Sequence, residues 1–283
     1  MRYHIEENFK IEHTIDMDEV KRIEVDILRT FVEFCEEHGL RYFLAGGTLI
    51  GAVRHQGFVP WDDDMDVTMP RPDFEKFREL TADGKLGRYE IRSMQHTPEI
   101  HCRPFDRIVN PDYMCSLSTD QIRLPPWLDV MAWDGLPDDE QENAKHWEKV
   151  QLLKHYAARA RTPISRTKKR IKRWMKYFIY LPLKLIGPHY FAKKINEIAK
   201  KYSFDDCEYV GTVFAGYGPK ERMPKYYFID GDIKKKLWFE GVYCSVPAHY
   251  DLVLKHMYGD YMKLPAKKKR RMHVKKAWKI TRI

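Results

Sequence analysis

The chain has 283 residues, of which 43% are hydrophobic and 13% aromatic, so it can bury a substantial core in one large domain or in one domain with an appendage. Its first residues lack the apolar segment of a signal peptide, and no stretch reaches the roughly 18 apolar residues of a membrane span. The five cysteines form no C-x-x-C pair, which argues against a disulfide framework and against a zinc cluster. We therefore expect a globular, cytoplasmic protein with reduced cysteines.

The net charge of +9 is distributed unevenly along the chain. Residues 151–196 contain thirteen Lys or Arg, residues 263–283 contain ten, and neither segment contains Asp or Glu. The remainder has 27 basic and 41 acidic residues, a formal charge of −14. An acidic body with two basic segments suggests a body that binds cations and segments that bind an anionic surface.

Hydrophobic periodicity and turn residues predict alternating helices and strands in the first half of the chain. The first helix has a capping-box-like start at Asp16 and Glu19, and Gly39 ends it. The predicted elements are helices at 16–38, 48–55 and 73–80 and strands at 42–45, 64–69, 89–94, 105–109 and 127–133.

The second half begins with a long predicted helix at 138–161, which has acids at its start and bases at its end, as the helix dipole prefers. Residues 166–186 then combine eight basic residues with interleaved Trp, Phe, Tyr and Leu. This composition predicts an interfacial amphipathic helix that Pro182 ends or kinks. It favours an anionic membrane surface over a solvated face or a nucleic-acid patch. Further strands and a helix are expected within residues 226–258.

The most informative stretch is residues 42–70, where four aspartates fall within five positions after a Gly-Gly pair. In a strand over 64–69, side chains alternate between the two faces, so Asp62, Asp64 and Asp66 share one face. Carboxylates arranged in this way repel one another unless a cation lies among them. The stretch therefore predicts a site for Mg²⁺ or Mn²⁺ bound through oxygen.

A third carboxylate is expected on the strand at 127–133, where Asp129 is the one charged residue of an apolar run. An Asp-x-Asp strand near a Gly-Gly turn, followed by a third strand carboxylate, is the arrangement that two-metal phosphoryl transfer requires. Asp64 and Asp66 are then favoured as ligands over Asp62 and Asp63. Asp129 is also the candidate general base for the attacking hydroxyl.

Several further residues are candidates for binding a phosphorylated substrate. Two glycines would let phosphate oxygens approach the N–H groups at the start of the next helix, where a hydroxyl could add a donor. A guanidinium meets phosphate oxygens in a planar fork, and an aromatic face attracts a quaternary ammonium, although packing is its commoner role. The candidates are Gly46, Gly47 and Thr48 at the helix start, the arginines Arg54, Arg103 and Arg107, and the aromatic residues Trp61 and Trp127.

The segment GGTLIGAVRHQGFVPWDDDMDVTMPRPDFEKF resembles the signature of the LicD/fukutin family of phosphotransferases, whose fold is similar to that of nucleotidyltransferases. LDVMAWDGLP is similar to a second block of that family, and YGDYMKLP with the basic tail and His273 is similar to a third. By matching positions, the resemblance implies that Asp64, Asp66 and Asp129 bind the metal. It also implies that Arg107 is the basic residue of the site and that His273 contacts substrate.

What the resemblance implies about activity is transfer of phosphocholine, or of a similar alcohol phosphate, from a CDP-alcohol such as CDP-choline. The acceptor would be a hydroxyl of a glycan or polyol-phosphate, including a lipid-linked teichoic acid or lipopolysaccharide precursor, and CMP would be released. We expect an α/β (α+β) fold with a nucleotidyltransferase-like mixed sheet and packed helices. The expected division is a catalytic core at 1–150, a basic helical insertion at 151–200 on the cytoplasmic face of the membrane, and the rest of the core with a basic tail at 201–283.

Three alternatives remain open. A nucleotidyltransferase would instead attack a nucleoside triphosphate and release pyrophosphate. A nucleic-acid-binding protein would use the two basic segments, but it leaves the carboxylates without a purpose, so we expect no nucleic-acid partner. A non-catalytic scaffold derived from such an enzyme would have no need to retain all three aspartates.

Overall fold

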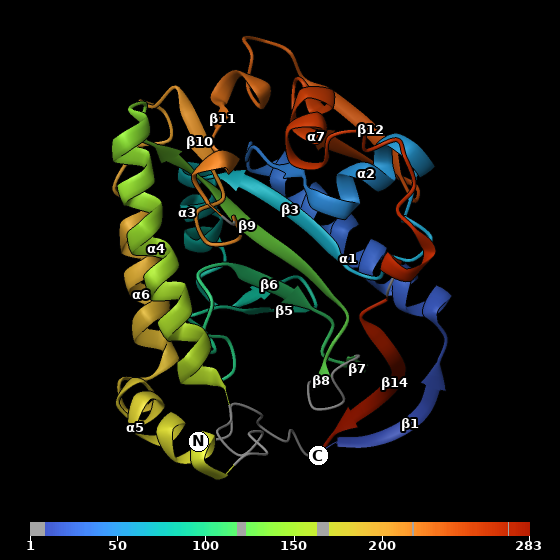
Figure 1. The fold of residues 1–283 in the computed structure, drawn as a ribbon. Helices are drawn as coiled ribbons and strands as arrows, with labels where there is room; N and C mark the ends of the chain where they lie inside the picture. The colour runs from blue at the N-terminus through green and yellow to red at the C-terminus, as the bar shows by residue number, and fades with distance from the viewer. Residues whose placement is uncertain (1–8, 118–122, 163–169, 217, 271) are drawn as a thin grey trace.

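The computed structural model describes residues 9–117, 123–162, 170–216, 218–270 and 272–283, which form three β-sheets and packed helices (Figure 1). The largest sheet has eight strands in the described part of the chain. They are β2 (Phe43–Leu44), β3 (Met65–Pro70), β4 (Lys85–Leu86), β5 (Tyr89–Arg92), β6 (Asp106–Val109), β9 (Trp127–Leu136), β10 (Tyr209–Gly211) and β11 (Met223–Pro224).

Strand β9 is the centre of this sheet, because its first half lies between β3 and β6 and its second half pairs with β10. The pairing of β3 with β9 is parallel, whereas all the other pairings of the sheet are antiparallel. The sheet is therefore mixed, and the predicted α+β class is confirmed.

Three helices from the first part of the chain pack around this sheet: α1 (Met17–Glu37), α2 (Gly46–His55) and α3 (Arg71–Leu80). The predicted start of α1 is confirmed, since Glu19 N donates to Asp16 Oδ1 over 2.8 Å. Ile27, Leu28 and Phe31 of α1 are fully buried, and each stabilises the fold by about 1.5–3 kcal/mol through apolar burial.

Two smaller sheets lie beside the main one. One joins the two ends of the chain in the strand order β1 (Phe9–Ile15), β14 (Val274–Arg282), β7 (Tyr113–Leu117), β8 (Arg123–Leu124). The other is the hairpin of β12 (Lys235–Phe239) and β13 (Val242–Val246), followed by helix α7 (Tyr250–Tyr258). Short 3₁₀ turns lie at Pro219–Glu221, Lys225–Tyr227 and Lys267–Lys269.

The basic segment forms a separate group of helices, α4 (Glu140–Arg161), α5 (Arg170–Ile186) and α6 (Pro188–Ala199) (Figure 1). Helices α4 and α6 bury Trp147 and Ile195 between them, and α5 packs at their far end. Pro182 lies inside α5 rather than ending it. Of the predicted helix at 166–186, residues 166–169 lie outside the described residues. Among the described helices, none has the length and apolar character needed to span a bilayer.

The structure corrects the predicted start of one helix and adds a strand that was not predicted. Helix α2 begins at Gly46, two residues before its predicted start, so the Gly-Gly pair is its first turn and not a break before it. The basic tail contains a strand, β14, which pairs with β1 and β7; its Val274, Ala277 and Ile280 are buried while the lysines between them remain accessible. The division of the chain at residues 150 and 200 stays a prediction.

Candidate active site

Three charged side chains form a row across neighbouring strands of the main sheet. Asp66 of β3 is the register partner of Asp129 on β9, and Asp129 is the register partner of Arg107 on β6. The parallel pairing of β3 and β9 therefore brings together the two carboxylates that the sequence places 63 positions apart. The prediction that Asp66 and Asp129 belong to one site agrees with this register.

Arg107 is bound to Asp129 in a bidentate ion pair. Its Nε and Nη2 donate to Oδ1 and Oδ2 of Asp129 over 2.5 and 2.7 Å, and the two side chains are only 13% and 12% exposed. The guanidinium also lies 5.1 Å above the ring of Trp127. Arg107 therefore holds the Asp129 carboxylate in place, whereas the sequence suggested that it meets substrate phosphate directly.

The two glycines at the start of α2 make room for carboxylates. A Cβ atom at Gly47 would lie 2.1 Å from Asp62 Oδ2, and one at Gly46 would lie 3.1 Å from Asp66 Oδ2. Gly46 also has a φ of +54°, which a side chain would strain. The clearance that the sequence assigned to a phosphate group is thus occupied by Asp62 and Asp66.

Thr48 fixes the position of Asp66. Its hydroxyl accepts a hydrogen bond from Asp66 N over 2.9 Å, and Ala45 N donates to Asp66 O over 3.0 Å. Thr48 is buried, and its hydroxyl contacts the strand. The backbone of Asp66 in this way joins strand β3 to the start of helix α2.

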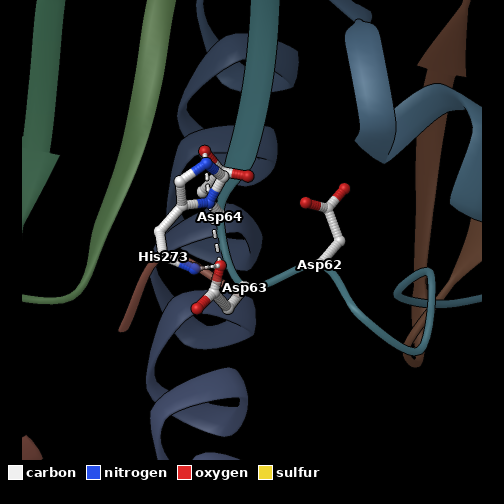
Figure 2. A group of neighbouring side chains, drawn as sticks. All are labelled: Asp62, Asp63, Asp64 and His273. Carbon is white, nitrogen blue, oxygen red and sulfur yellow. Dashed lines mark hydrogen bonds and ion pairs between the residues drawn. The ribbon is translucent and has the colours of Figure 1, made fainter. Parts of the chain in front are cut away.

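Asp63 points away from its neighbours and anchors the C-terminal strand. It is fully buried, and its carboxylate accepts hydrogen bonds from His273 N, His273 Nδ1 and Val274 N over 2.8, 3.0 and 2.6 Å (Figure 2). The hydrogen bond to Asp63 is the main cause that raises the pKa of His273 to about 9. With this pKa, the imidazole of His273 is protonated and cationic at neutral pH. A protonated imidazole cannot ligate a metal.

The carboxyl groups of Asp62, Asp64 and Asp66 lie close together, and Asp64 Oδ2 is 3.8 Å from His273 Nδ1. Burial raises the pKa of Asp62, and burial with the charge of Asp62 raises the pKa of Asp64 to about 7. Burial, followed by the charges of Asp129 and Asp64, raises the pKa of Asp66 well above its usual value. Among the described residues, neither Asp62 nor Asp66 forms an ion pair with a Lys or Arg.

This set of donors fits a hard divalent cation. Asp62, Asp63, Asp64 and His273 each bring an oxygen or ring nitrogen within 4.8 Å of the others. Asp63 and His273 bind each other, so the oxygens left for a cation come from Asp62 and Asp64, with Asp66 next along the strand. Crowded carboxylate oxygens suit Mg²⁺ or Mn²⁺, and such an ion would relieve their repulsion.

The structure places the two candidate tryptophans differently. Trp127 is 3% exposed within the core around β7 and β14, which corrects the prediction that it binds substrate. Trp61 is half-buried, and the guanidinium groups of Arg54 and Arg270 lie 5.9 and 4.4 Å from its ring centre. Its ring is thus already in contact with cationic side chains.

Arg54 lies at the other end of α2 from the glycines. Its Nη1 donates to Tyr261 O over 2.7 Å and its Nε donates to His55 Nε2 over 2.9 Å. Burial, with the nearby charge of Arg270, lowers the pKa of Arg54. Its role as a phosphate ligand stays a prediction.

Sequence reasoning missed two features of this site. The role of Asp63 could have been inferred from strand alternation, which directs it away from Asp62 and Asp64. The second feature is Glu24 of α1, which is fully buried with neither carboxylate oxygen hydrogen-bonded among the described residues. Its burial and the charge of Asp64 raise its pKa, but an acid inside an amphipathic helix carries no signal of its own in the sequence.

Part of the chain that contains these residues matches a known protein family. Residues 39–102, which include α2, the aspartates at 62–66 and helix α3, match the family described as LicD/FKTN/FKRP, nucleotidyltransferase domain. Over residues 39–102 the chain is similar to that domain. The resemblance predicted from the sequence motifs is therefore confirmed.

The match to one named relative extends well beyond this domain. The lipopolysaccharide cholinephosphotransferase LicD of Haemophilus influenzae is 29% identical over 257 residues, which cover 88% of this chain and 92% of that protein. The human and mouse ribitol 5-phosphate transferases FKRP are 49% identical over 39 residues, 14% of this chain and 8% of theirs. The match to LicD includes β9 as well as the LicD-family domain, and the prediction of a phosphotransferase is confirmed.

Proposed function

We propose that this protein transfers phosphocholine, or a similar alcohol phosphate, from a CDP-alcohol to a hydroxyl group of a glycan and releases CMP. The acceptor class includes lipopolysaccharide precursors, teichoic acids and other polyol-phosphates. The observation that supports this most is the register of Asp66 with Asp129, which gathers the carboxylates of β3 and β9 in one site. The similarity over most of the chain to a lipopolysaccharide cholinephosphotransferase supports the choice of substrates.

In this proposal Asp64, Asp66 and Asp129 hold Mg²⁺ or Mn²⁺, with Asp62 beside them. A bound divalent cation would neutralise charge on the donor diphosphate as the phosphorus–oxygen bond breaks. Asp62 and Asp66 reach their positions because the first turn of α2 presents glycine to them. Arg107 keeps the carboxylate of Asp129 oriented through two hydrogen bonds.

Asp129 also serves as the general base in the proposal. Each of its oxygens accepts one bond from Arg107, and a carboxylate oxygen has a second lone pair for another donor. The acceptor hydroxyl gives its proton to Asp129 as its oxygen bonds to the phosphorus that carries choline. The bond from that phosphorus to the oxygen of CMP breaks in the same displacement.

The reaction is tested by incubating the protein and Mg²⁺ with a panel of CDP-alcohols and, separately, with CTP. We expect CMP from a CDP-alcohol, formed slowly by transfer to water when no acceptor is present. Pyrophosphate from CTP without CMP from any CDP-alcohol would instead assign a nucleotidyltransferase. Failure of the protein to bind any divalent metal would support the non-catalytic scaffold.

We also propose that α5 binds the anionic surface of a membrane on its cytoplasmic face. Trp174, Phe178, Leu181 and Leu185 recur at the spacing of one helical face, and all four are exposed, Phe178 and Leu185 by 77% and 80%. Residues 166–186 contain eight basic residues and no acid, which complements anionic lipid headgroups. A lipid-linked acceptor would be met at the same surface.

Vesicle binding tests this surface. The double variant Phe178→Ser/Leu185→Ser should bind phosphatidylglycerol-containing vesicles at least about tenfold more weakly, since each buried side chain contributes roughly 1.5–3 kcal/mol. The control Ile11→Ser/Ile233→Ser removes two aliphatic side chains that are 48% and 44% exposed elsewhere, and it should bind as the wild type does. Equal binding by both double variants would refute the assignment to α5.

A further inference from the structure

A group of arginines lies on the side of Asp129 that faces away from the other aspartates. Arg103 precedes β6 in the loop that leads to Arg107, and Arg161 is the last residue of α4. The guanidinium groups of Arg103 and Arg107 lie 5.8 and 5.7 Å from the same aromatic ring, that of Phe105. Arg161 Nη1 donates to the carbonyl of Cys102, over 3.5 Å. Arg103 therefore lies within electrostatic range of Arg107, Arg161 and Asp129, which come from β6, α4 and β9.

Acidic partners do not balance these charges. Both oxygens of Asp129 are bound by Arg107, and among the described residues neither Arg103 nor Arg161 forms an ion pair with a carboxylate. The positive charges of Arg107 and Arg161 both act on Arg103, and burial lowers the pKa of Arg161. Clustered cations of this kind are stabilised when an anion binds between them.

His101 and Phe105 also hold the loop that carries Arg103. The Nε2–H group of buried His101 donates to Phe105 O over 2.8 Å, and its ring packs edge-on against the ring of Phe105. Burial lowers the pKa of His101 to about 3, so the ring is neutral and adds no charge to the group. Arg103 itself is exposed, and a ligand can reach it.

We infer that Arg103 and Arg161 form a phosphate-binding subsite next to Asp129, and this inference rests on the proposed transfer reaction. From Asp66 and Asp129 to Arg107 and Arg103, the side chains change from negative to positive. A diphosphate has one end for a cation held by the carboxylates and one for the guanidinium groups, which meet phosphate oxygens in a planar fork. The ligand class is a phosphate ester, either the diphosphate of the nucleotide donor or a phosphate carried by the acceptor.

Equilibrium binding tests this subsite without relying on turnover. Titrations of wild-type protein, Arg103→Gln and Arg161→Gln with CDP, CMP and glycerol phosphate measure which phosphate the pair holds. We expect each variant to bind CDP roughly tenfold more weakly or worse, and CMP much less affected, because each substitution removes a charge-assisted hydrogen bond. Arg159→Gln removes the same charge from the same helical turn and should leave CDP binding unchanged. Circular dichroism and melting curves establish that the variants are folded.

The outcomes separate the subsite from the reaction. Loss of glycerol phosphate binding with unchanged CDP binding would assign the subsite to a phosphate on the acceptor. Folded Arg103→Gln and Arg161→Gln proteins that bind all three ligands as the wild type does would overturn the inference, even if CDP-choline is cleaved. If the arginines govern CDP binding but no CDP-alcohol yields CMP, the subsite stands and the proposed function fails.

Discussion

The ion pair of Arg107 with Asp129 makes a quantitative prediction about stability. Replacing Arg107 by Met removes both hydrogen bonds and leaves Asp129 buried beside Asp66 without its cation. Breaking a buried pair from one side typically destabilises a protein by about 3–5 kcal/mol, because the remaining charge has no partner. At roughly 2–4 °C of melting temperature per kcal/mol, we expect a decrease on the order of 10 °C for Arg107→Met.

The double variant Arg107→Met/Asp129→Asn should regain more than half of this loss, since the buried charge is then also removed. Arg88→Met is the matched control, because Arg88 is 67% exposed and its ion pair with Asp26 is 3.8 Å long. We expect it to change the free energy of unfolding by at most about 0.5 kcal/mol. Melting curves measured by scanning calorimetry without metal provide the comparison. Equal destabilisation in the single and double Arg107 variants would refute the reasoning.

Three further predictions concern the carboxylates. Gly47→Ala should weaken Mn²⁺ binding at least about tenfold in calorimetric titration, because its Cβ would displace Asp62. The control Gly218→Ala, with no atom within 4 Å of the added Cβ, should bind Mn²⁺ as the wild type does. Equal affinities of the two variants would contradict the role of Gly47. Because the folded-state pKa of Asp64 is raised to about 7, the stability of metal-free protein should fall as the pH rises from about 4 to 7, and Asp64→Asn should flatten this slope in urea unfolding. The raised pKa of His273 also makes stability fall with rising pH, but in a higher range, so stability should be lost as the pH approaches 9. His273→Gln should show no such loss.

The sequence predicts those parts of the molecule that depend on local periodicity. Hydrophobic residues recur at helical spacing within residues 16–38, and α1 forms there with Asp16 as its N-cap. The same holds for the strand of Asp66 and for the apolar run around Asp129, which are β3 and β9. The residue types and spacing of these two strands select the carboxylates of the proposed site, although buried strands also hold Asp106 and Asp134, which pair with Arg78 and Arg71.

What the sequence does not predict depends on register and on distant contacts. Arg107 is bound to Asp129 because β6 and β9 pair in one particular register, and nothing local to either strand specifies it. The bonds of Asp63 to the backbone of His273 span 210 positions. The close approach of Asp62 to Gly47 likewise appears only once α2 and the loop before β3 are packed together. These contacts decide which charges are neutralised, and so which aspartates remain for a cation.

The central claim is that Asp64, Asp66 and Asp129 support Mg²⁺-dependent cleavage of a CDP-alcohol. Its most direct test is the amount of CMP formed from CDP-choline by wild-type protein and by folded Asp66→Asn protein, with and without Mg²⁺. The account predicts CMP from the wild type only when Mg²⁺ is present, and a loss of at least about a hundredfold in Asp66→Asn, as expected when a group essential to charge stabilisation is removed. CMP formation by Asp66→Asn at the wild-type rate, or by the wild type without any divalent metal, would contradict it.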